Sequence, residues 1–280
     1  MTTVLSIMSF RRHSTHTAAI IAALAGLYAR AEGAPPLPLR AGLAASREIV
    51  SPYSAIFESP PRQVPSFKIV DGPITGNGDI GLTVSGPPEC QRYWISKNDF
   101  WKSGPNFKQC GPSLIGGLDI RIEEIKGASY HVEQHLYEAA ITSKFVRGET
   151  VVELKAQVAA TDNVLVLVLR ASGQSVRVNL NLWAKEGYGS ETRNGRDGEV
   201  FWVMRKFDSA DLLYPTAATI AMRCLESEAP GFVLLPGRPV TIVGSVMTNH
   251  ESERYHSWVR EKVTTMGHEA VGRLQAEHER

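Results

Sequence analysis

From about residue 48 onward, apolar and polar residues alternate along the chain in short runs. Examples are SFKIV at 66–70, IGLTVS at 80–85, LDIRIEEI at 118–125 and TVVELKAQVAA at 150–160. These runs are rich in Val, Ile, Thr and aromatic residues, and short connections carrying Gly, Asn, Asp or Pro separate them. Many short alternating strands with close turns are typical of a sandwich or barrel. We therefore predict an all-β fold, a large two-sheet antiparallel super-sandwich.

Three of the connections predict hairpins. Gly148-Glu149 separates two alternating runs, and Asp162-Asn163 separates two more. Asn77-Gly78 is a strong hairpin signal, because both residues tolerate positive φ. The run NVLVLVLR at 163–170 is apolar at nearly every position. That pattern indicates a strand buried on both faces, as expected where two sheets pack together.

The period changes near the end of the chain. Residues 252–280 carry Val271 and Leu274 among charges spaced for i,i+4 pairing, which predicts a helix. We interpret 251–280 as the start of a C-terminal linker helix that the chain leaves unfinished. Residues 32–47 are rich in Pro, Gly and Ala and are interpreted as a flexible linker. The sandwich would then span residues 48–250.

The first 31 residues have the pattern of a secretory signal peptide. A basic segment at Arg11 and Arg12 precedes an apolar stretch at 17–29, and Ala29-Arg30-Ala31 follows as a cleavage pattern. A transit peptide or an uncleaved anchor is the alternative. The prediction is a secreted, extracellular protein with no membrane attachment after cleavage.

Charge and cysteine content narrow the classes of partner. The 280 residues carry a net charge of +1 and no long run of either sign, which gives no support to nucleic-acid or membrane binding. Three cysteines are present. Cys90 and Cys110 could close a loop in an oxidising compartment and leave Cys224 as a buried thiol, or all three could be unpaired.

Gly76, Gly78 and Gly81 have the G-x-G-x-x-G spacing of a dinucleotide-binding loop. That loop requires a helix to begin at its last glycine. Here Thr83 follows within a β-branched segment that ends in Gly-Pro-Pro at 86–88, so no helix can form. The segment is better interpreted as a hairpin turn. Its Asn and Asp side chains could contact sugar hydroxyls, or it could be a turn without a ligand.

TGNGDIGLTVSG at 75–86 and ISKNDFWKSG at 95–104 together resemble the N-terminal β-sandwich of family 95 glycoside hydrolases, the α-L-fucosidase type. The positions that match the family pattern are Gly76, Asn77, Gly78, Gly81 and Gly86, followed by Ile95, Trp101 and Gly104. Ser96 and Lys97 depart from it, because the family usually has Asn and Glu there. This indicates a divergent branch whose sugar need not be fucose.

The resemblance, which covers about residues 67–280, implies a function. Such enzymes hydrolyse O-glycosidic bonds with inversion, and an (α/α)6 barrel after the sandwich carries the catalytic carboxyl pair. The resemblance therefore implies that the chain ends before the barrel, which would be in a longer or separate chain. We predict a carbohydrate partner, no cofactor and no catalytic residue within the chain. The predicted substrate-binding residues are Asn77, Asp79, Asn98, Asp99 and Trp101.

The remaining candidates for chemistry are weaker. His131 and His135 lie on a predicted strand, where a four-residue spacing places them about 13 Å apart, too far to share a metal. His250, His256 and His268 near the C-terminus are expected at the surface. Two other functions stay open beside the enzyme domain: a stand-alone, lectin-like carbohydrate-binding module, and a purely structural sandwich.

Overall fold

The computed structural model describes residues 39–63, 70–104 and 110–278. The chain divides after Ile49 into two units. The segment predicted as a signal peptide and most of the SFKIV run lie outside the described residues. Helix α2 (Leu39–Val50) overlaps the segment interpreted as a linker, where no helix was expected.

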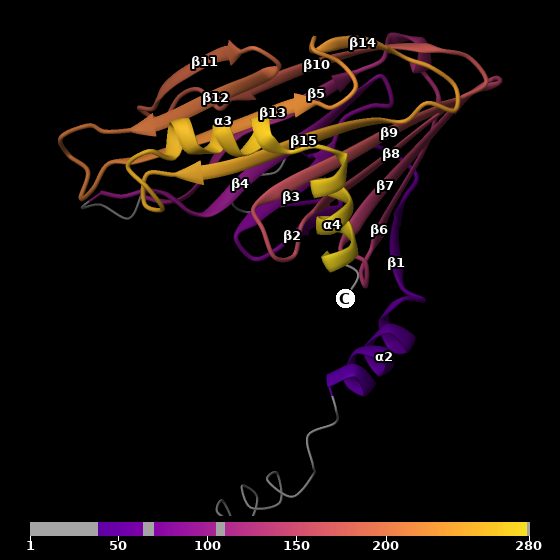
Figure 1. Ribbon diagram of the computed structural model, residues 1–280, viewed down its shortest axis with the longest axis horizontal. Coiled ribbons are helices and arrows are strands. Elements are labelled where there is room, and N and C mark those ends of the chain that lie inside the picture. Colours follow the sequence, from indigo (N-terminus) through magenta and orange to yellow (C-terminus); the bar gives the residue numbers. More distant parts are fainter. Residues whose placement is uncertain (1–38, 64–69, 105–109, 279–280) are drawn as a thin grey trace, which may run out of the picture. The chain divides into compact units, whose positions relative to one another are not determined.

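The described residues from Val50 onward form two antiparallel sheets (Figure 1). The larger sheet has nine strands in the order β1 (Ser54–Phe57), β6 (Ser129–His135), β7 (Ala140–Arg147), β8 (Thr150–Val158), β9 (Val164–Ser172), β15 (Val240–Thr248), β13 (Thr216–Cys224), β12 (Val200–Phe207) and β11 (Glu191–Asp197). The smaller sheet has six, in the order β14 (Gly231–Leu234), β10 (Val176–Ala184), β5 (Gly111–Arg121), β4 (Cys90–Lys102), β3 (Ile80–Ser85) and β2 (Ile74–Gly76). The predicted all-β, two-sheet sandwich is confirmed.

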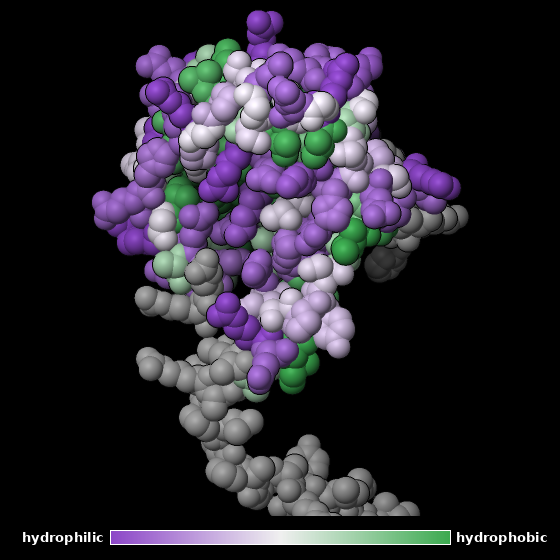
Figure 2. All heavy atoms as spheres, turned by 90° about the vertical axis from the view of Figure 1, so that its right-hand side faces the viewer, coloured by the Kyte–Doolittle hydropathy of each residue, from purple (hydrophilic) through white to green (hydrophobic). Residues whose placement is uncertain are grey.

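The main core lies between the two sheets. Alternate residues of each strand point inward, such as Leu118 and Ile120 of β5 and Leu165 and Leu167 of β9. All four are at most 1% exposed. Side chains on the opposite faces are more polar, and hydrophilic residues predominate on the face shown in Figure 2. The alternation in the sequence therefore corresponds to the inner and outer faces of the sheets.

A second core covers the outer face of the larger sheet. Helix α3 (Tyr255–Thr265) runs across β12, β13 and β15 (Figure 1), and helix α4 (His268–His278) follows it. Val259 and Val263 of α3 pack with Val164 and Val166 of β9. Strand β9 is therefore buried on both faces, as predicted. Its second face, however, is covered by the C-terminal helices, which the sequence interpretation did not anticipate.

The predicted turns are present. Gly148-Glu149 joins β7 to β8, and the loop at 159–163 joins β8 to β9. Asn77-Gly78-Asp79 joins β2 to β3, with Gly78 at φ +87°. That left-handed conformation is one that glycine adopts without steric cost.

Cysteines and histidines correct two details of the sequence interpretation. Cys90 and Cys110 are not joined in a disulfide, and burial raises the pKa of the Cys224 thiol to about 11. His256 is not a plain surface residue. Its ring packs against Trp202 and hydrogen-bonds the Thr219 hydroxyl at 3.1 Å, and burial lowers its pKa. None of the described helices is long and apolar enough to cross a membrane.

Candidate functional site

Asn77 ties the two sheets together at the β2–β3 turn. Its side-chain oxygen accepts hydrogen bonds from the backbone N–H groups of Asp79 and Ile80, at 3.0 and 2.8 Å. Its amide nitrogen donates to the carbonyls of Ala159 and Asp162 in the β8–β9 loop of the larger sheet, at 3.1 and 3.2 Å. These contacts use most of the hydrogen-bonding capacity of the amide. The geometry therefore gives Asn77 a structural role.

Lys97 is the centre of an ion cluster that contains two of the predicted residues, Asp79 and Asp99. Only 2% of its side chain is exposed, and its ammonium nitrogen lies 2.8 Å from Asp79, 3.1 Å from Asp99 and 3.3 Å from Glu251. Burial by itself lowers the pKa of Lys97. The hydrogen bonds that Lys97 donates to Asp79 and Asp99, together with the charge of Glu251, outweigh that effect, so the pKa is raised overall. The lysine remains charged, and its partners hold it in place.

Neighbouring polar groups fix those carboxylates in turn. The Thr248 hydroxyl donates to Asp99 at 2.6 Å, and the Thr248 backbone N–H donates to Glu251 at 2.8 Å. The side-chain amide of Asn163 donates to Asp79. The network thus joins β4 and the β2–β3 turn to β15 and the β8–β9 loop. We call it the Lys97 cluster: Lys97, Asp79, Asp99 and Glu251.

The sequence analysis did not identify Glu251 or Thr248, which lie some 150 residues after Lys97 in the chain. The one local signal was Lys97 itself, which stands where the family pattern usually has Glu and lies two residues before Asp99. A buried lysine two residues after Ile95 and four after Tyr93, both core residues of the same strand, requires nearby carboxylates.

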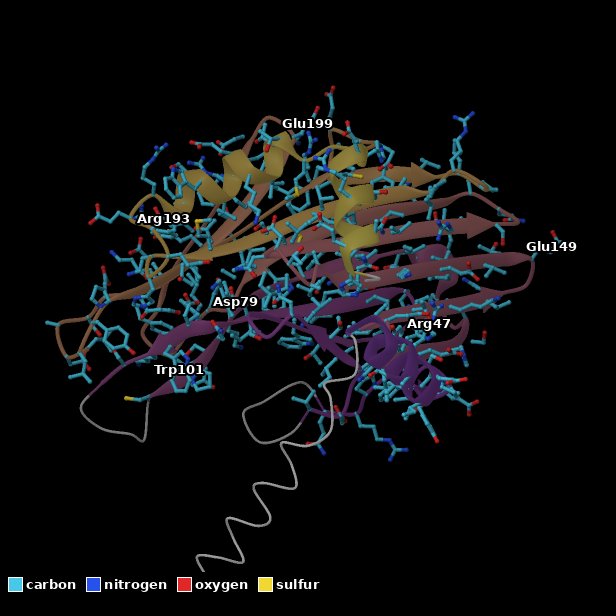
Figure 3. All side chains as sticks on the ribbon, turned by 60° about the horizontal axis from the view of Figure 1, so that its bottom comes forward. Arg47, Asp79, Trp101, Glu149, Arg193 and Glu199 are labelled. Carbon is cyan, nitrogen blue, oxygen red and sulfur yellow. The ribbon has the colours of Figure 1, made fainter. Side chains whose placement is uncertain are left out.

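The other two predicted residues border this cluster. Asn98 donates its backbone N–H to the Asp79 carbonyl at 2.8 Å and its side-chain amide to the Gly78 carbonyl at 3.2 Å. Trp101 donates its indole N–H to the Asn98 carbonyl. Its ring is 44% exposed. Figure 3 shows Asp79 and Trp101 along the smaller sheet.

Two hollows flank the Lys97 cluster. The smaller, of about 490 Å³, is lined by Asp99, Trp101, Tyr214 and His250, and we call it the Trp101 hollow. Tyr214 is 44% exposed, its ring lies 5.5 Å from that of His250, and its carbonyl accepts from the Ser103 hydroxyl at 2.9 Å. Two exposed aromatic rings thus stand beside a fixed carboxylate.

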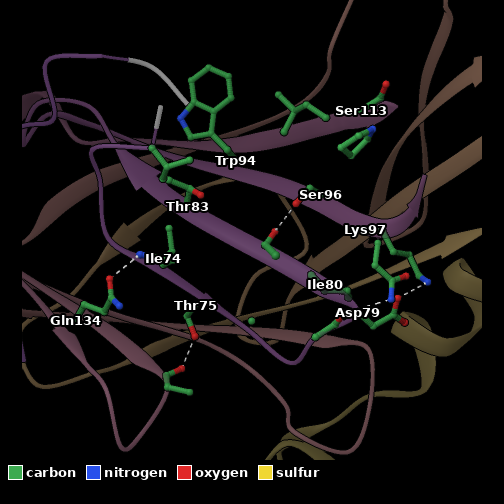
Figure 4. A pocket seen from close by; sticks show the side chains of 18 of the residues that line it. Ile74, Thr75, Asp79, Ile80, Thr83, Trp94, Ser96, Lys97, Ser113 and Gln134 are labelled. Carbon is green, nitrogen blue, oxygen red and sulfur yellow. Dashed lines mark hydrogen bonds and ion pairs between the residues drawn. The ribbon is translucent and has the colours of Figure 1, made fainter. Parts of the chain in front are cut away.

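The larger hollow is a groove of about 770 Å³ (Figure 4). It runs beside β2, β3 and the start of β5 and reaches the turn between β6 and β7. Asp79 and Asn98 lie on its lining. The five predicted residues therefore separate: Asp99 and Trp101 line the Trp101 hollow, Asp79 and Asn98 line the groove, and Asn77 lines neither.

Within the described parts of the chain, no three His, Cys, Asp or Glu side chains are grouped so that they could hold a metal ion. His131 and His135 both face Glu133, at 2.8 and 3.7 Å, and His135 also bonds the Thr142 hydroxyl at 2.8 Å.

Comparisons with known proteins find the fold in a solved structure. No family model matches the chain, and no curated protein matches it. A "putative kojibiose phosphorylase from human microbiome" superposes with a TM-score of 0.52 at 13% identity. The match covers 82% of this chain and 34% of that one. The likeness establishes the fold. This chain spans about a third of that protein, which by its name is a carbohydrate-active enzyme.

Proposed function

We propose that this sandwich is the N-terminal domain of a carbohydrate-active enzyme of the glycoside hydrolase and phosphorylase class. It would line part of the sugar cleft and pack against a helical barrel that carries the catalytic groups, in the same longer protein or on a separate chain. The likeness to a third of a kojibiose phosphorylase supports the class. The resemblance of 75–104 to family 95 supports hydrolysis of an O-glycosidic bond, and the pattern at 1–31 supports secretion.

The observation that carries the sugar-binding role is the Trp101 hollow. A pyranose presents C–H groups to an aromatic face, and its hydroxyls donate to carboxylate oxygens. Trp101 and Tyr214 offer the rings, and Asp99 offers a carboxylate that Lys97 and Thr248 hold at 3.1 and 2.6 Å. A fixed acceptor beside exposed rings is suited to a neutral sugar.

The arrangement of carboxylates supports a domain without its own catalytic pair. Glycoside hydrolysis needs two carboxyl groups on opposite sides of the bond. Asp79, Asp99 and Glu251 instead converge on Lys97, so these three are placed around one cation and not on opposite sides of a glycosidic bond.

The test is to titrate the full chain with a panel of neutral monosaccharides and disaccharides, observed by ligand NMR and calorimetry. Trp101→Ala is expected to weaken binding about tenfold, which corresponds to about 1.4 kcal/mol. Trp258→Ala is the matched control, because Trp258 is 43% exposed on α3 and lines neither hollow. Equal binding by both variants would show that the sugar does not bind in the Trp101 hollow.

A turnover assay tests the missing catalytic pair. The full chain should release no phenol from aryl glycosides, with or without phosphate. Turnover that disappears on substitution of a single carboxylate would show that the domain is catalytic by itself.

The Trp101 hollow also favours a second function, a stand-alone carbohydrate-binding module. Exposed apolar residues at the same end separate the two. Leu213 is 72% exposed and Tyr188 is 77% exposed, in loops tied to β4 through the Lys102–Tyr188 and Ser103–Tyr214 hydrogen bonds. A domain that packs against a barrel should self-associate or bind an apolar dye through this end, and Leu213→Ser should reduce both. A module that works alone should do neither.

A further inference from the structure

The groove is a built cavity that the sugar-binding role does not use. None of the four residues that line the Trp101 hollow lines the groove. Its volume of about 770 Å³ lies within the range of small-molecule sites, about 300–1,000 Å³. Its walls come from both sheets: β2, β3 and β4 of the smaller sheet, and the β6–β7 turn of the larger one. Figure 4 shows their side chains lining it.

The charges on the groove wall are neutralised within the protein. Lys97 and Asp79 form an ion pair at 2.8 Å, and Lys97 contacts two further carboxylates. His135 is hydrogen-bonded to Thr142 at 2.8 Å and faces Glu133. An anion or a cation entering the groove would lose its hydration shell without gaining an unpaired partner. The groove is therefore suited to an uncharged ligand.

The rest of the lining places apolar side chains beside polar ones. Ile74 and Leu136, 50% and 48% exposed, are apolar side chains at its rim. Thr83, Ser96 and Gln134 supply polar groups. Gln134 accepts a hydrogen bond from the Ile74 N–H through its side-chain oxygen, at 2.9 Å. Among the described residues, its amide nitrogen and the Thr83 hydroxyl have no hydrogen-bond partner. These groups are open to a ligand.

The rim is held in a strained conformation. Ala139 in the β6–β7 turn has φ +43°, in the left-handed region that is unfavourable for a non-glycine residue. The Thr75 hydroxyl donates to the Ala139 carbonyl, and the His278 ring contacts the Glu138 carbonyl at 2.7 Å. Two contacts from separate elements thus fix the turn that closes the groove on one side. Strain held in this way is found at ligand sites.

We propose that this groove binds an uncharged amphipathic glycoside, with an aryl or alkyl group against Ile74 and Leu136 and sugar hydroxyls against Thr83, Ser96 and Gln134. Trp94, which pairs with Thr83 between β4 and β3, forms a rigid part of the wall. Its indole N–H donates to the Ser85 hydroxyl at 2.7 Å, and its ring meets Trp183 edge-on at 5.3 Å. This site differs from the Trp101 hollow in its position and in the ligand that it would select.

The experiment titrates the full chain by calorimetry with the 4-nitrophenyl glycosides of glucose, galactose and fucose. Two probes test the selectivity: 4-nitrophenyl glucuronide adds a negative charge, and methyl glucoside lacks the aryl group. At least one neutral aryl glycoside should bind about tenfold more tightly than either probe. Equal affinity for the glucuronide, or no binding of any aryl glycoside, would overturn the proposal.

Variants locate the ligand. Thr83→Phe should fill the groove and abolish binding, and Ile74→Ala should weaken it. Val233→Ala should leave the affinity unchanged, because Val233 is also on an edge strand of the smaller sheet and is 53% exposed, yet does not line the groove. Binding that survives in a folded Thr83→Phe variant would overturn the proposal. If that variant does not fold, Gln134→Ala decides in the same way.

Trp101→Ala separates this proposal from the proposed function. It should leave the affinity for aryl glycosides in the groove unchanged. If it abolishes that binding while Thr83→Phe does not, the ligand occupies the Trp101 hollow, the groove proposal fails and the sugar-binding role stands. If Thr83→Phe abolishes binding of aryl glycosides while Trp101→Ala has no effect on any sugar, the groove proposal stands and the role of the hollow fails.

Discussion

Replacing Lys97 with Met removes the charge at the centre of the Lys97 cluster and keeps most of the side chain's length. Three carboxylates then face one another around a buried apolar group, in place of an ammonium within 3.3 Å of each. The hydrogen bonds from Thr248 and Asn163 remain but do not neutralise them. The substitution therefore tests whether this ion cluster holds the two sheets together.

The expected loss in the free energy of unfolding depends on how deeply Lys97 and its three carboxylate partners are buried. Removing one partner of a fully buried ion pair costs about 3–5 kcal/mol. Here the lysine is buried, but the three carboxylates are each about 30% exposed, so water screens part of the repulsion that remains. We expect Lys97→Met to lower the free energy of unfolding by about 2–3 kcal/mol at pH 7.

The assay is urea unfolding of wild type, Lys97→Met and Lys144→Met, with tryptophan fluorescence as the readout. Lys144 is the matched control: its side chain is 53% exposed and pairs with Glu153 at 3.3 Å, so its replacement should cost no more than about 0.5 kcal/mol. Because the native pKa of Lys97 is raised, its stabilising contribution is fully present below the ordinary lysine value of about 10.4. It is lost as the pH rises through the higher native value.

The difference between wild type and Lys97→Met should therefore be constant from pH 6 to 9 and shrink only in strongly alkaline solution. A loss below about 1 kcal/mol, or one equal to that of Lys144→Met, would refute the structural role of the cluster.

Three further substitutions test other parts of the fold. Asp119 is 1% exposed and accepts two hydrogen bonds from Arg92, at 2.6 and 2.8 Å, so Asp119→Asn should cost about 2–3 kcal/mol at neutral pH. Burial alone would raise the pKa of Asp119, but the hydrogen bonds and charge of Arg92 lower it overall. The stabilisation by the Asp119 carboxylate is therefore lost as the pH falls below the ordinary aspartate value of about 3.9. The acid unfolding curves of wild type and Asp119→Asn should converge there. Asn77→Ala should lower the melting temperature through the loss of about 2–3 kcal/mol, and an unchanged melt would show that the link between the sheets is dispensable. Gly117→Ala places a Cβ 2.3 Å from a backbone oxygen and 2.6 Å from a tryptophan ring, so it should destabilise by about 1–3 kcal/mol, whereas Gly267→Ala, with nothing within 4 Å, should have little effect in the same calorimetric scan.

The sequence was sufficient to predict the sandwich and several of its turns. Alternation over 150–160 and the dipeptides Gly148-Glu149 and Asn77-Gly78 are local signals, and strand pairing follows from them when the connection is two or three residues long. The family pattern at 75–104 also drew attention to the segments that meet around Lys97. Whether those segments bind sugar remains a prediction.

Two features could not be predicted from local patterns. The sequence predicts that the apolar outer face of β9 is buried, but it does not show which element packs against that face. Whether a sheet or a helix supplies it depends on where residues 255–278 return to the molecule. The same limit applies to the division of the predicted residues between two hollows, since Tyr214 and His250 join Trp101 from loops more than 100 residues away in the chain.

The sequence by itself determined which residues form strands, which faces of those strands are apolar and where the chain turns, because these depend on interactions between near neighbours. The tertiary structure decided the roles of the polar residues. Asn77 became a link between the sheets because the β8–β9 loop presents carbonyls to it, and Lys97 became the centre of a charge cluster because Glu251 lies beside it in space. A side chain's chemistry depends on its partners, and long-range packing alone brings those partners within hydrogen-bonding distance.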